Sequence, residues 1–329
     1  MARHSRSLPP TELTIFGYLA AGTVTVADIG ALMSQINRRT FRQGMQYAVA
    51  KVEFYTVGAE IVVGRLPHHW PSVNAWTKTM ALWKQQQDDR LEQSGLEQTV
   101  AAHRDFKIFI DGDHANGAYL DLQAVTVQNA GLGIEENYMT LAEGQAISPT
   151  VDLDWDKSQV VFPNFGAPGV TVEYNLHMLG DDVPFVSKGM IKAYAESRNR
   201  PMQTDPNIVD VPLGGMFGSM FDVGDDSGDI ITNAQEANTA LPYLNDVDTA
   251  LEFYPGGSQT GSGVTLVDTL SIVAGSNRTL ASSTTGPFLA NCGLLLLANN
   301  GDNITGVRIT LMPGDYKGVM ARPMQDVNN

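Results

Sequence analysis

Five arginine residues near the N-terminus offer the clearest chemistry in this chain of 329 residues: Arg3, Arg6, Arg38, Arg39 and Arg42. A guanidinium group binds phosphate oxygens through paired, charge-assisted hydrogen bonds. The first 60 residues have a net charge of +2, whereas the remaining 269 carry −17, which gives the chain its net −15. Because an acidic body repels phosphate, we expect the N-terminal segment to make any contact with nucleic acid.

Three of these arginines are close enough in sequence to act together. Arg38, Arg39 and Arg42 lie within about 15 Å of chain even if it is fully extended, so they can contact one nucleic-acid backbone. The open alternative is that they pair with Glu53, with Glu60 or with acidic neighbours at a subunit interface.

The chain lacks the sequence motifs of several common enzyme classes. It has no glycine-rich phosphate loop, no G-x-S-x-G motif and no H-E-x-x-H motif. These motifs carry nucleotide binding, serine hydrolysis and zinc-dependent hydrolysis respectively. We therefore predict no catalytic residue, no enzyme activity and no cofactor.

Candidate metal ligands occur in three short segments, and we predict a metal site in none of them. His68 and His69 are adjacent, so their side chains diverge on an extended chain and a loop or packing role is expected. Asp111 and Asp113 lack a ligand at the next alternate position of a calcium loop, where Ala115 stands. A solvated turn is expected for the third group, which comprises Asp222, Asp225, Asp226 and Asp229.

Two other potentially reactive side chains are expected to have ordinary structural roles. Cys292 is the only cysteine, which excludes an intrachain disulfide. It opens the apolar run 292–297, so a buried, unreactive thiol is predicted. His177 falls on the polar face of the alternating segment 170–178, so we expect it to be exposed to solvent.

The N-terminus partly imitates a secretory signal peptide, because basic residues precede an apolar stretch that begins at Leu13. Pro9, Pro10 and Glu12 interrupt that pattern, and we expect the segment to be retained. No stretch has the apolar length needed to cross a bilayer, so no membrane partner is predicted.

A short helix and a strand must position the arginines. Residues 27–38 carry apolar side chains at helical spacing and predict an amphipathic helix that ends at Arg38. Residues 47–55 alternate, which places Ala48, Ala50, Val52 and Phe54 on one face and leaves Val49 as an apolar exception on the other. A turn at 58–59 and the apolar residues 61–63 then predict a β-hairpin.

A tryptophan-rich helix is predicted next, with Ser72 as its N-cap and an end near Ser94-Gly95. Its apolar residues share one side, where they must cover a sheet or pack on a neighbouring subunit. They are Val73, Trp76, Met80 and Trp83.

The rest of the chain reads mostly as strands. We expect a second hairpin over 106–127 that turns at Asn116-Gly117, and a helix that Ser187 caps and that runs through Tyr194. Further strands are expected at 158–162, 170–178, 265–273, 287–298, 306–312 and 316–321. Residues 294–297 are apolar on both faces, as in a strand that is buried from both sides.

These elements predict a mainly β protein, an antiparallel β-sandwich with helices and loops inserted in its connections. We divide the chain into an N-terminal arm with a short helix, residues 1–44, and a sandwich domain, residues 45–329. Insertions are expected at about 71–105, where the chain is helical, and at 187–263, where it forms surface loops and helices.

The order of five segments resembles the capsid proteins of small circular single-stranded DNA viruses that are known mainly from environmental sequencing. The segments are INRRTFRQG, QYAVAKVEFY, LPHHWPSVNAW, SKGMIKAYAESRNRP and TGPFLANCGLLLL, within residues 26–320. The resemblance implies a single jelly roll that self-assembles into an icosahedral shell around a genome, expected to be single-stranded DNA. It also implies a virion protein that is assembled inside the host cell and contacts a host receptor through surface loops.

The chain departs from this family in its N-terminal charge. Many of the family's members carry a long arginine-rich arm, whereas this chain has only the five arginines named above. A double jelly roll, as in larger acidic shells, is therefore kept as an alternative fold.

Two further functions are compatible with the sequence. A carbohydrate-binding or adhesin-like β-sandwich would explain the strands, the acidity and the Asp-rich loops. A hydrolase on a β scaffold would require a pair of catalytic carboxylates, and no such pair is evident.

Overall fold

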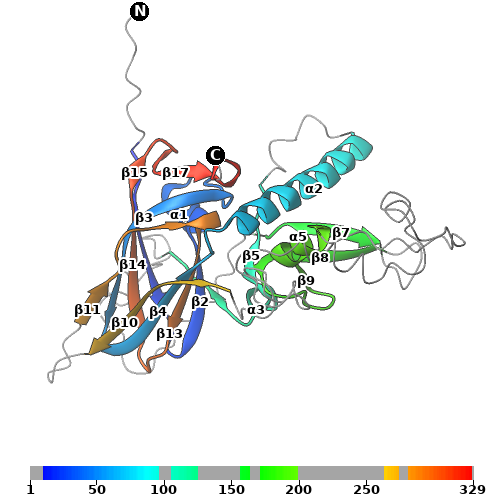
Figure 1. Ribbon diagram of the computed structural model, residues 1–329. Helices are drawn as coiled ribbons and strands as arrows, with labels where there is room; N and C mark the ends of the chain where they lie inside the picture. Colours follow the sequence, from blue (N-terminus) through cyan, green and yellow to red (C-terminus); the bar gives the residue numbers. More distant parts are fainter. Residues whose placement is uncertain are drawn as a thin grey trace, which may run out of the picture.

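The computed structural model of the protein describes residues 10–95, 105–124, 156–163, 171–198, 263–273 and 281–327. Two β-sheets packed face to face form the main body (Figure 1). The predicted mainly β fold, an antiparallel β-sandwich, is therefore confirmed. Most of the expected insertion at 187–263, including the aspartate group at 222–229, lies outside the described residues.

The first sheet, sheet A, has the strand order β1–β14–β3–β11, and β12 and β17 also pair with β3. Its strands are β1 (Thr14–Leu19), β14 (Thr305–Leu311), β3 (Met45–Thr56), β11 (Ala281–Thr284), β12 (Phe288–Ala290) and β17 (Ala321–Pro323). A short hairpin of β15 (Pro313–Gly314) and β16 (Gly318–Val319) lies between β14 and β17 in the chain.

The second sheet, sheet B, has the order β10–β4–β13–β2–β6. Its strands are β10 (Thr265–Val273), β4 (Gly58–Arg65), β13 (Leu294–Asn299), β2 (Thr23–Asp28) and β6 (Leu120–Asp121). Helix α1 (Ile29–Asn37) follows β2 directly, and Asp28 accepts a hydrogen bond from the Ala31 N–H as its N-cap.

Nine strands of the sandwich pair in a nested order of eight positions along the chain, because β11 and β12 follow each other in sheet A and share the sixth position. The first pairs with the last, β1 with β14, and the second with the seventh, β2 with β13. The third, β3, pairs with β11 and β12, and the fourth, β4, pairs with β10. All of these pairings are antiparallel. The strands β1, β2, β3 and β4 lie alternately in sheets A and B, and so do β12, β13 and β14.

Strands β1 and β2 correct the expected division of the chain at residue 44. The segment 13–19, predicted as part of an extended arm, contains β1 of sheet A, which places Ile15 and Leu19 in the core. β2 and α1 likewise pack into the sandwich. The predicted helix before Arg38 is present, but it belongs to the sandwich and not to a separate arm.

The hairpin predicted over residues 48–63 is wrong, because β3 and β4 lie in different sheets. The chain crosses from one sheet to the other at Val57. The predicted hairpin over 106–127 is wrong for the same reason, since β5 (Phe109–Asp111) pairs with β8 and β6 pairs with β2. The expected strand 287–298 is similarly divided by the 3₁₀ turn η3 (Asn291–Gly293) into β12 of sheet A and β13 of sheet B.

A β-bulge changes which side chains of β3 face the core. β14 pairs Thr310 with Lys51 and Leu311 with Val49, so Ala50 is an extra residue without a partner. The bulge reverses the alternation at this point. The core side is therefore Tyr47 and Val49 before the bulge and Val52 and Phe54 after it, which corrects the expected face and explains Val49.

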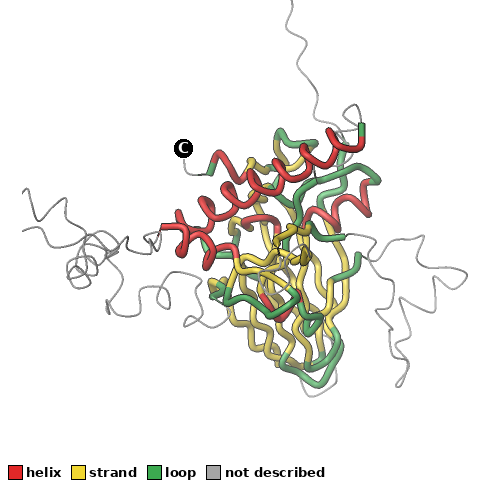
Figure 2. Tube along the Cα trace, turned by 90° about the vertical axis from the view of Figure 1, so that its right-hand side faces the viewer, coloured by secondary structure: helices red, strands yellow, loops and turns green. Residues whose placement is uncertain are grey.

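A second layer covers the outer face of sheet B (Figure 1). It contains helix α2 (Trp70–Ser94), helix α5 (Met190–Arg198) and the four-stranded sheet C with the order β5–β8–β7 and β9 beside β8. The strands of sheet C not yet located are β7 (Gln159–Pro163), β8 (Thr171–Leu179) and β9 (Ser187–Gly189). Within the described residues this layer forms no second sandwich. Figure 2 shows the long helix lying across the strands.

The apolar side of α2 is confirmed as a packing surface. Val73, Trp76 and Trp83 are buried, and both tryptophan rings contact Phe106, with centroids 5.8 and 5.3 Å away. The helix ends at Gly95 in the left-handed conformation, as expected. Ser72 is not its N-cap: His69 takes that position without a side-chain hydrogen bond, and Ser72 is buried in the first turn.

We expect Trp76→Ala to lower the free energy of unfolding by about 3–5 kcal/mol, because the ring is only 4% exposed in the second layer. Denaturant-induced unfolding of purified protein measures the change. Trp76→Phe should cost much less, since the indole N–H has no hydrogen-bond partner that would be lost. Leu82→Ala on the exposed side of the same helix is the matched control, and an unchanged stability of Trp76→Ala would show that the packing is not as described.

Candidate nucleic-acid interface

The structure brings three of the five predicted arginines onto one exposed segment between α1 and β3. Arg38 follows the last residue of α1 in the left-handed conformation, with φ 51°, and its side chain is exposed. Arg39 and Arg42 are also exposed. Arg3 and Arg6 lie outside the described residues. The chain that follows them reaches the same place, because the Glu12 N–H donates to Asn37 at the end of α1.

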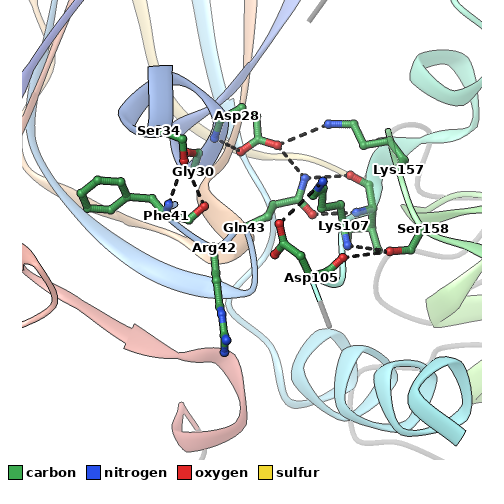
Figure 3. A network of polar contacts seen from close by, with 12 residues as sticks. Asp28, Gly30, Ser34, Phe41, Arg42, Gln43, Asp105, Lys107, Lys157 and Ser158 are labelled. Atoms are coloured by element: carbon green, nitrogen blue, oxygen red, sulfur yellow. Dashed lines mark hydrogen bonds and ion pairs between the residues drawn. The ribbon is translucent and has the colours of Figure 1, made fainter. Parts of the chain in front are cut away.

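Hydrogen bonds to helix α1 fix the backbone of this segment (Figure 3). The Phe41 N–H donates to Ser34 Oγ at 2.7 Å, and the Ser34 hydroxyl donates to the Gly30 carbonyl at 2.7 Å. Phe41 itself is fully buried. The segment that carries the three arginines is therefore attached to α1 at Phe41.

Two tyrosine hydroxyls hold the backbone of Arg42. The Arg42 N–H donates to Tyr316 Oη at 3.2 Å, and Tyr47 Oη donates to the Arg42 carbonyl at 2.6 Å. Burial raises the pKa of both tyrosines, so the hydroxyls stay protonated and Tyr47 remains a donor. The main chain of Arg42 is fixed while its guanidinium group points outward.

Lys317 adds a cation that the sequence did not predict. It lies in the β15–β16 hairpin, and its ammonium group donates to the Thr40 carbonyl. The ammonium nitrogen also lies 5.7 Å from the Phe41 ring centroid and 5.6 Å from that of Tyr316. No local pattern could have indicated this residue, because only the pairing of β14 with β3 brings position 317 to position 40.

Carboxylates moderate the positive charge of this surface. Glu12 and Asp315 are exposed on the neighbouring segments. Burial raises the pKa of Asp105, although the nearby charges of Lys107 and Arg42 partly offset the effect. The four cations Arg38, Arg39, Arg42 and Lys317 therefore outnumber the three acids around them.

A buried polar network lies beneath the arginine segment and joins it to the second layer (Figure 3). Asp28 accepts from Gln43 Nε2 at 2.8 Å and from Lys157 Nζ at 3.3 Å. Gln43 also exchanges two hydrogen bonds with the backbone of Ile108. The side chains of Asp28 and Lys157 are 3% and 7% exposed, so this ion pair is shielded from water and its removal on one side would leave a buried charge unpaired.

Among the described residues, Arg38, Arg39 and Arg42 form no ion pair with Glu53. Glu53 is bound by Lys51 at 3.0 Å and by Arg308. Glu60 is exposed. In the described part of the chain, Arg38 and Arg39 make no ion pair, which leaves both side chains available to a partner.

The prediction that His177 is exposed is wrong, since it is fully buried in sheet C. Its Nε2 contacts the Asp181 carbonyl at 2.9 Å, and its Nδ1 contacts Ser187 Oγ at 2.9 Å. A carbonyl only accepts, so Nε2 carries the proton and the Ser187 hydroxyl donates to Nδ1. Ser187 is therefore not a helix cap: it lies in β9 and is bound to His177.

This serine and histidine have the hydrogen-bond direction of a nucleophile and its base. Both side chains are 0% exposed, however, and no substrate can reach the hydroxyl in this arrangement. The hydrogen bond between Ser187 and His177 instead links β9 to β8. His114 is engaged in a comparable way, because its two ring nitrogens contact the Ile110 N–H and Asp121.

The remaining candidate ligands are structural in the described residues. Cys292 is fully buried, as predicted, and burial raises the pKa of its thiol. His68 contacts Gln46, and Asp111 caps the short helix α3 (Gly112–Ala115) by accepting from the His114 N–H. Across the described ranges, no group of three or more His, Cys, Asp or Glu side chains is arranged to hold a metal ion.

Comparison with known proteins gave no match: no family model, no curated protein and no solved structure is similar to this chain. Of the helices that the structure describes, none is long and apolar enough to span a membrane.

We expect His177 to make the fold less stable in mild acid. Burial lowers the pKa of its imidazole below the usual 6.5, although Asp181 and Asp182 partly oppose this. The unfolded chain therefore takes up the proton first, and stability falls as the pH drops below about 6.5 toward the folded-state pKa, by at most about 1.4 kcal/mol for each pH unit.

Denaturant unfolding at pH 7.5 and 5.5 tests this expectation. His177→Gln, which keeps an N–H donor for the Asp181 carbonyl, should lose less stability between the two pH values than the wild type does. His68→Gln removes an exposed imidazole and serves as the control. Equal losses in the wild type and His177→Gln would contradict the assignment.

Proposed function

We propose that the sandwich is a jelly roll and that the protein is a capsid protein, which assembles from many copies of itself into an icosahedral shell around nucleic acid. The observation that carries this proposal is the nested pairing of eight strand positions, with β11 and β12 together as the sixth: first with eighth, second with seventh, third with sixth and fourth with fifth. One long antiparallel hairpin wound around a barrel would give such a nested order, which supports the jelly-roll topology found in viral capsids and lectins.

The position of the insertion supports the same function. β4 ends at Arg65 and β10 begins at Thr265, so one connection of the roll carries most of the residues outside the sandwich. Its described part covers the outer face of sheet B. In a shell, such a connection would lie on the surface, where loops can contact a host receptor.

The basic segment supports a role in binding the genome, which we propose to be single-stranded DNA, by Arg38, Arg39 and Arg42, and by Arg3 and Arg6 on the preceding chain. The three described arginines are exposed, and hydrogen bonds position the backbone of the segment. Contacts of this kind are made to phosphates and carry no sequence preference. We propose a virion location, with assembly inside the host cell.

Self-assembly is tested directly by negative-stain electron microscopy and light scattering of the purified full chain. We expect closed particles that form without any covalent link, because one buried cysteine cannot staple subunits together. A protein that is monomeric or trimeric across salt and pH, and that binds glycans, would instead support the carbohydrate-binding sandwich.

The genome contact is tested by replacing Arg38, Arg39 and Arg42 together with Gln. We expect intact particles whose 260-to-280 nm absorbance ratio has fallen to that of protein. In a binding titration with single-stranded DNA, the slope of log affinity against log salt should become less negative by roughly 2, since three phosphate contacts are lost.

A matched variant removes the same charge from another surface: Lys78, Lys84 and Arg90, exposed on α2, are replaced with Gln. It should package nucleic acid as the wild type does. Normal packaging by the first variant, or an equal loss in both variants, would contradict the assigned interface.

A further inference from the structure

The turn between β8 and β9 displays a phenylalanine in an unfavourable conformation. Phe185 has φ 60°, in the left-handed region, where a side chain crowds the backbone and glycine or asparagine is favoured. The Val186 N–H donates to the Val183 carbonyl at 3.1 Å, so Pro184 and Phe185 form the centre of a tight turn. Phe185 is also 82% exposed, the highest value among the large apolar side chains that the structure describes.

The surrounding contacts hold this turn rigidly. Val183 and Ser187 exchange backbone hydrogen bonds of 2.9 and 3.1 Å across its base. Asp182 accepts from the Gly189 N–H at 2.9 Å, and the Ser187 hydroxyl is bound to buried His177. The fold thus fixes the backbone of an exposed aromatic residue in a conformation that is unfavourable for it.

Charge around the turn is cancelled locally. Asp181 lies 3.2 Å from Lys192, and Asp182 lies 2.8 Å from Lys188. A chain with a net charge of −15 repels its own copies, so contacts between copies are favoured where the local charge is neutral. The tip of this turn meets that condition, because Pro184 and Phe185 are uncharged and the neighbouring Asp181 and Asp182 are paired with lysines.

We propose that Phe185 is a preformed anchor that inserts into an apolar site on a second copy of this chain. Buried aromatic side chains supply much of the energy of protein interfaces. Because the backbone that carries the ring is already ordered by the turn, docking would cost mainly the freedom of this one side chain. This inference rests on the proposed self-assembly and names one of its contacts.

The test uses the full chain with Phe185→Gly, which removes the ring and suits the left-handed conformation. We expect assembly, measured by sedimentation velocity and light scattering at equal protein concentration, to be lost or to need at least tenfold more protein. The melting temperature of the unassembled subunit should stay the same or rise by roughly 2–4 °C, because an unfavourable conformation is relieved. Phe185→Tyr should retain assembly.

The matched control is Leu82→Gln, which removes a partly exposed apolar side chain from α2 and should assemble normally. Shells formed by Phe185→Gly at the wild-type concentration would overturn the proposal and assign the ring to another partner or to none. A lowered melting temperature would also overturn it, since Phe185 would then stabilise the subunit itself. A wild-type chain that stays monomeric in every condition would instead overturn the proposed shell function.

Discussion

Strand β13 is buried on both faces, and the rest of the architecture depends on this constraint. It lies in the middle of sheet B between β4 and β2. Leu295 and Leu297 point into the core between the two sheets, while Leu294 and Leu296 pack in the second layer. A sheet with apolar side chains on both faces cannot leave either face to water. The inserted layer is therefore an integral part of the fold, and Leu294 and Leu296 pack in the same apolar cluster as Trp76, Trp83 and Phe106.

The junction between the two layers is held by polar groups as well as by apolar packing. Asp28 ends β2, caps α1 and binds Lys157 of the inserted layer. Because the ion pair is nearly dehydrated, the cost of removing both charges from water offsets much of their attraction, so the pair adds little net stability. Gln43, which binds both Asp28 and the backbone of Ile108, fixes the start of β3 to the same junction. The arginine segment between α1 and β3 therefore has a rigid base.

The sequence was sufficient for features that depend on local periodicity. The alternation in 170–178 predicted β8 to within one residue, and the strands expected at 265–273 and 306–312 correspond to β10 and β14. The double-sided apolar run identified the buried strand β13. The partners of each strand could not be obtained in this way, because β3 and β4 are adjacent in sequence but lie in opposite sheets. The bulge at Ala50 reversed the expected face of β3. His177 follows the polar alternation of β8 but is buried, since Ser187 and the Asp181 carbonyl satisfy its ring.

The candidate interface also combines residues that local sequence predicts with residues that only strand pairing brings together, and it contains few cations. Exposed arginines were predictable from composition and spacing, whereas Lys317 and the two tyrosines reach Arg42 and Thr40 only through the sheet pairing. A long, flexible basic arm must lose conformational entropy at every residue that it orders on a nucleic acid. Here hydrogen bonds made during folding have already ordered the backbone at Phe41 and Arg42. If the proposed shell forms, each phosphate contact would cost mainly the freedom of one side chain. A few cations on an ordered backbone, repeated over the copies of such a shell, would then replace a longer arm.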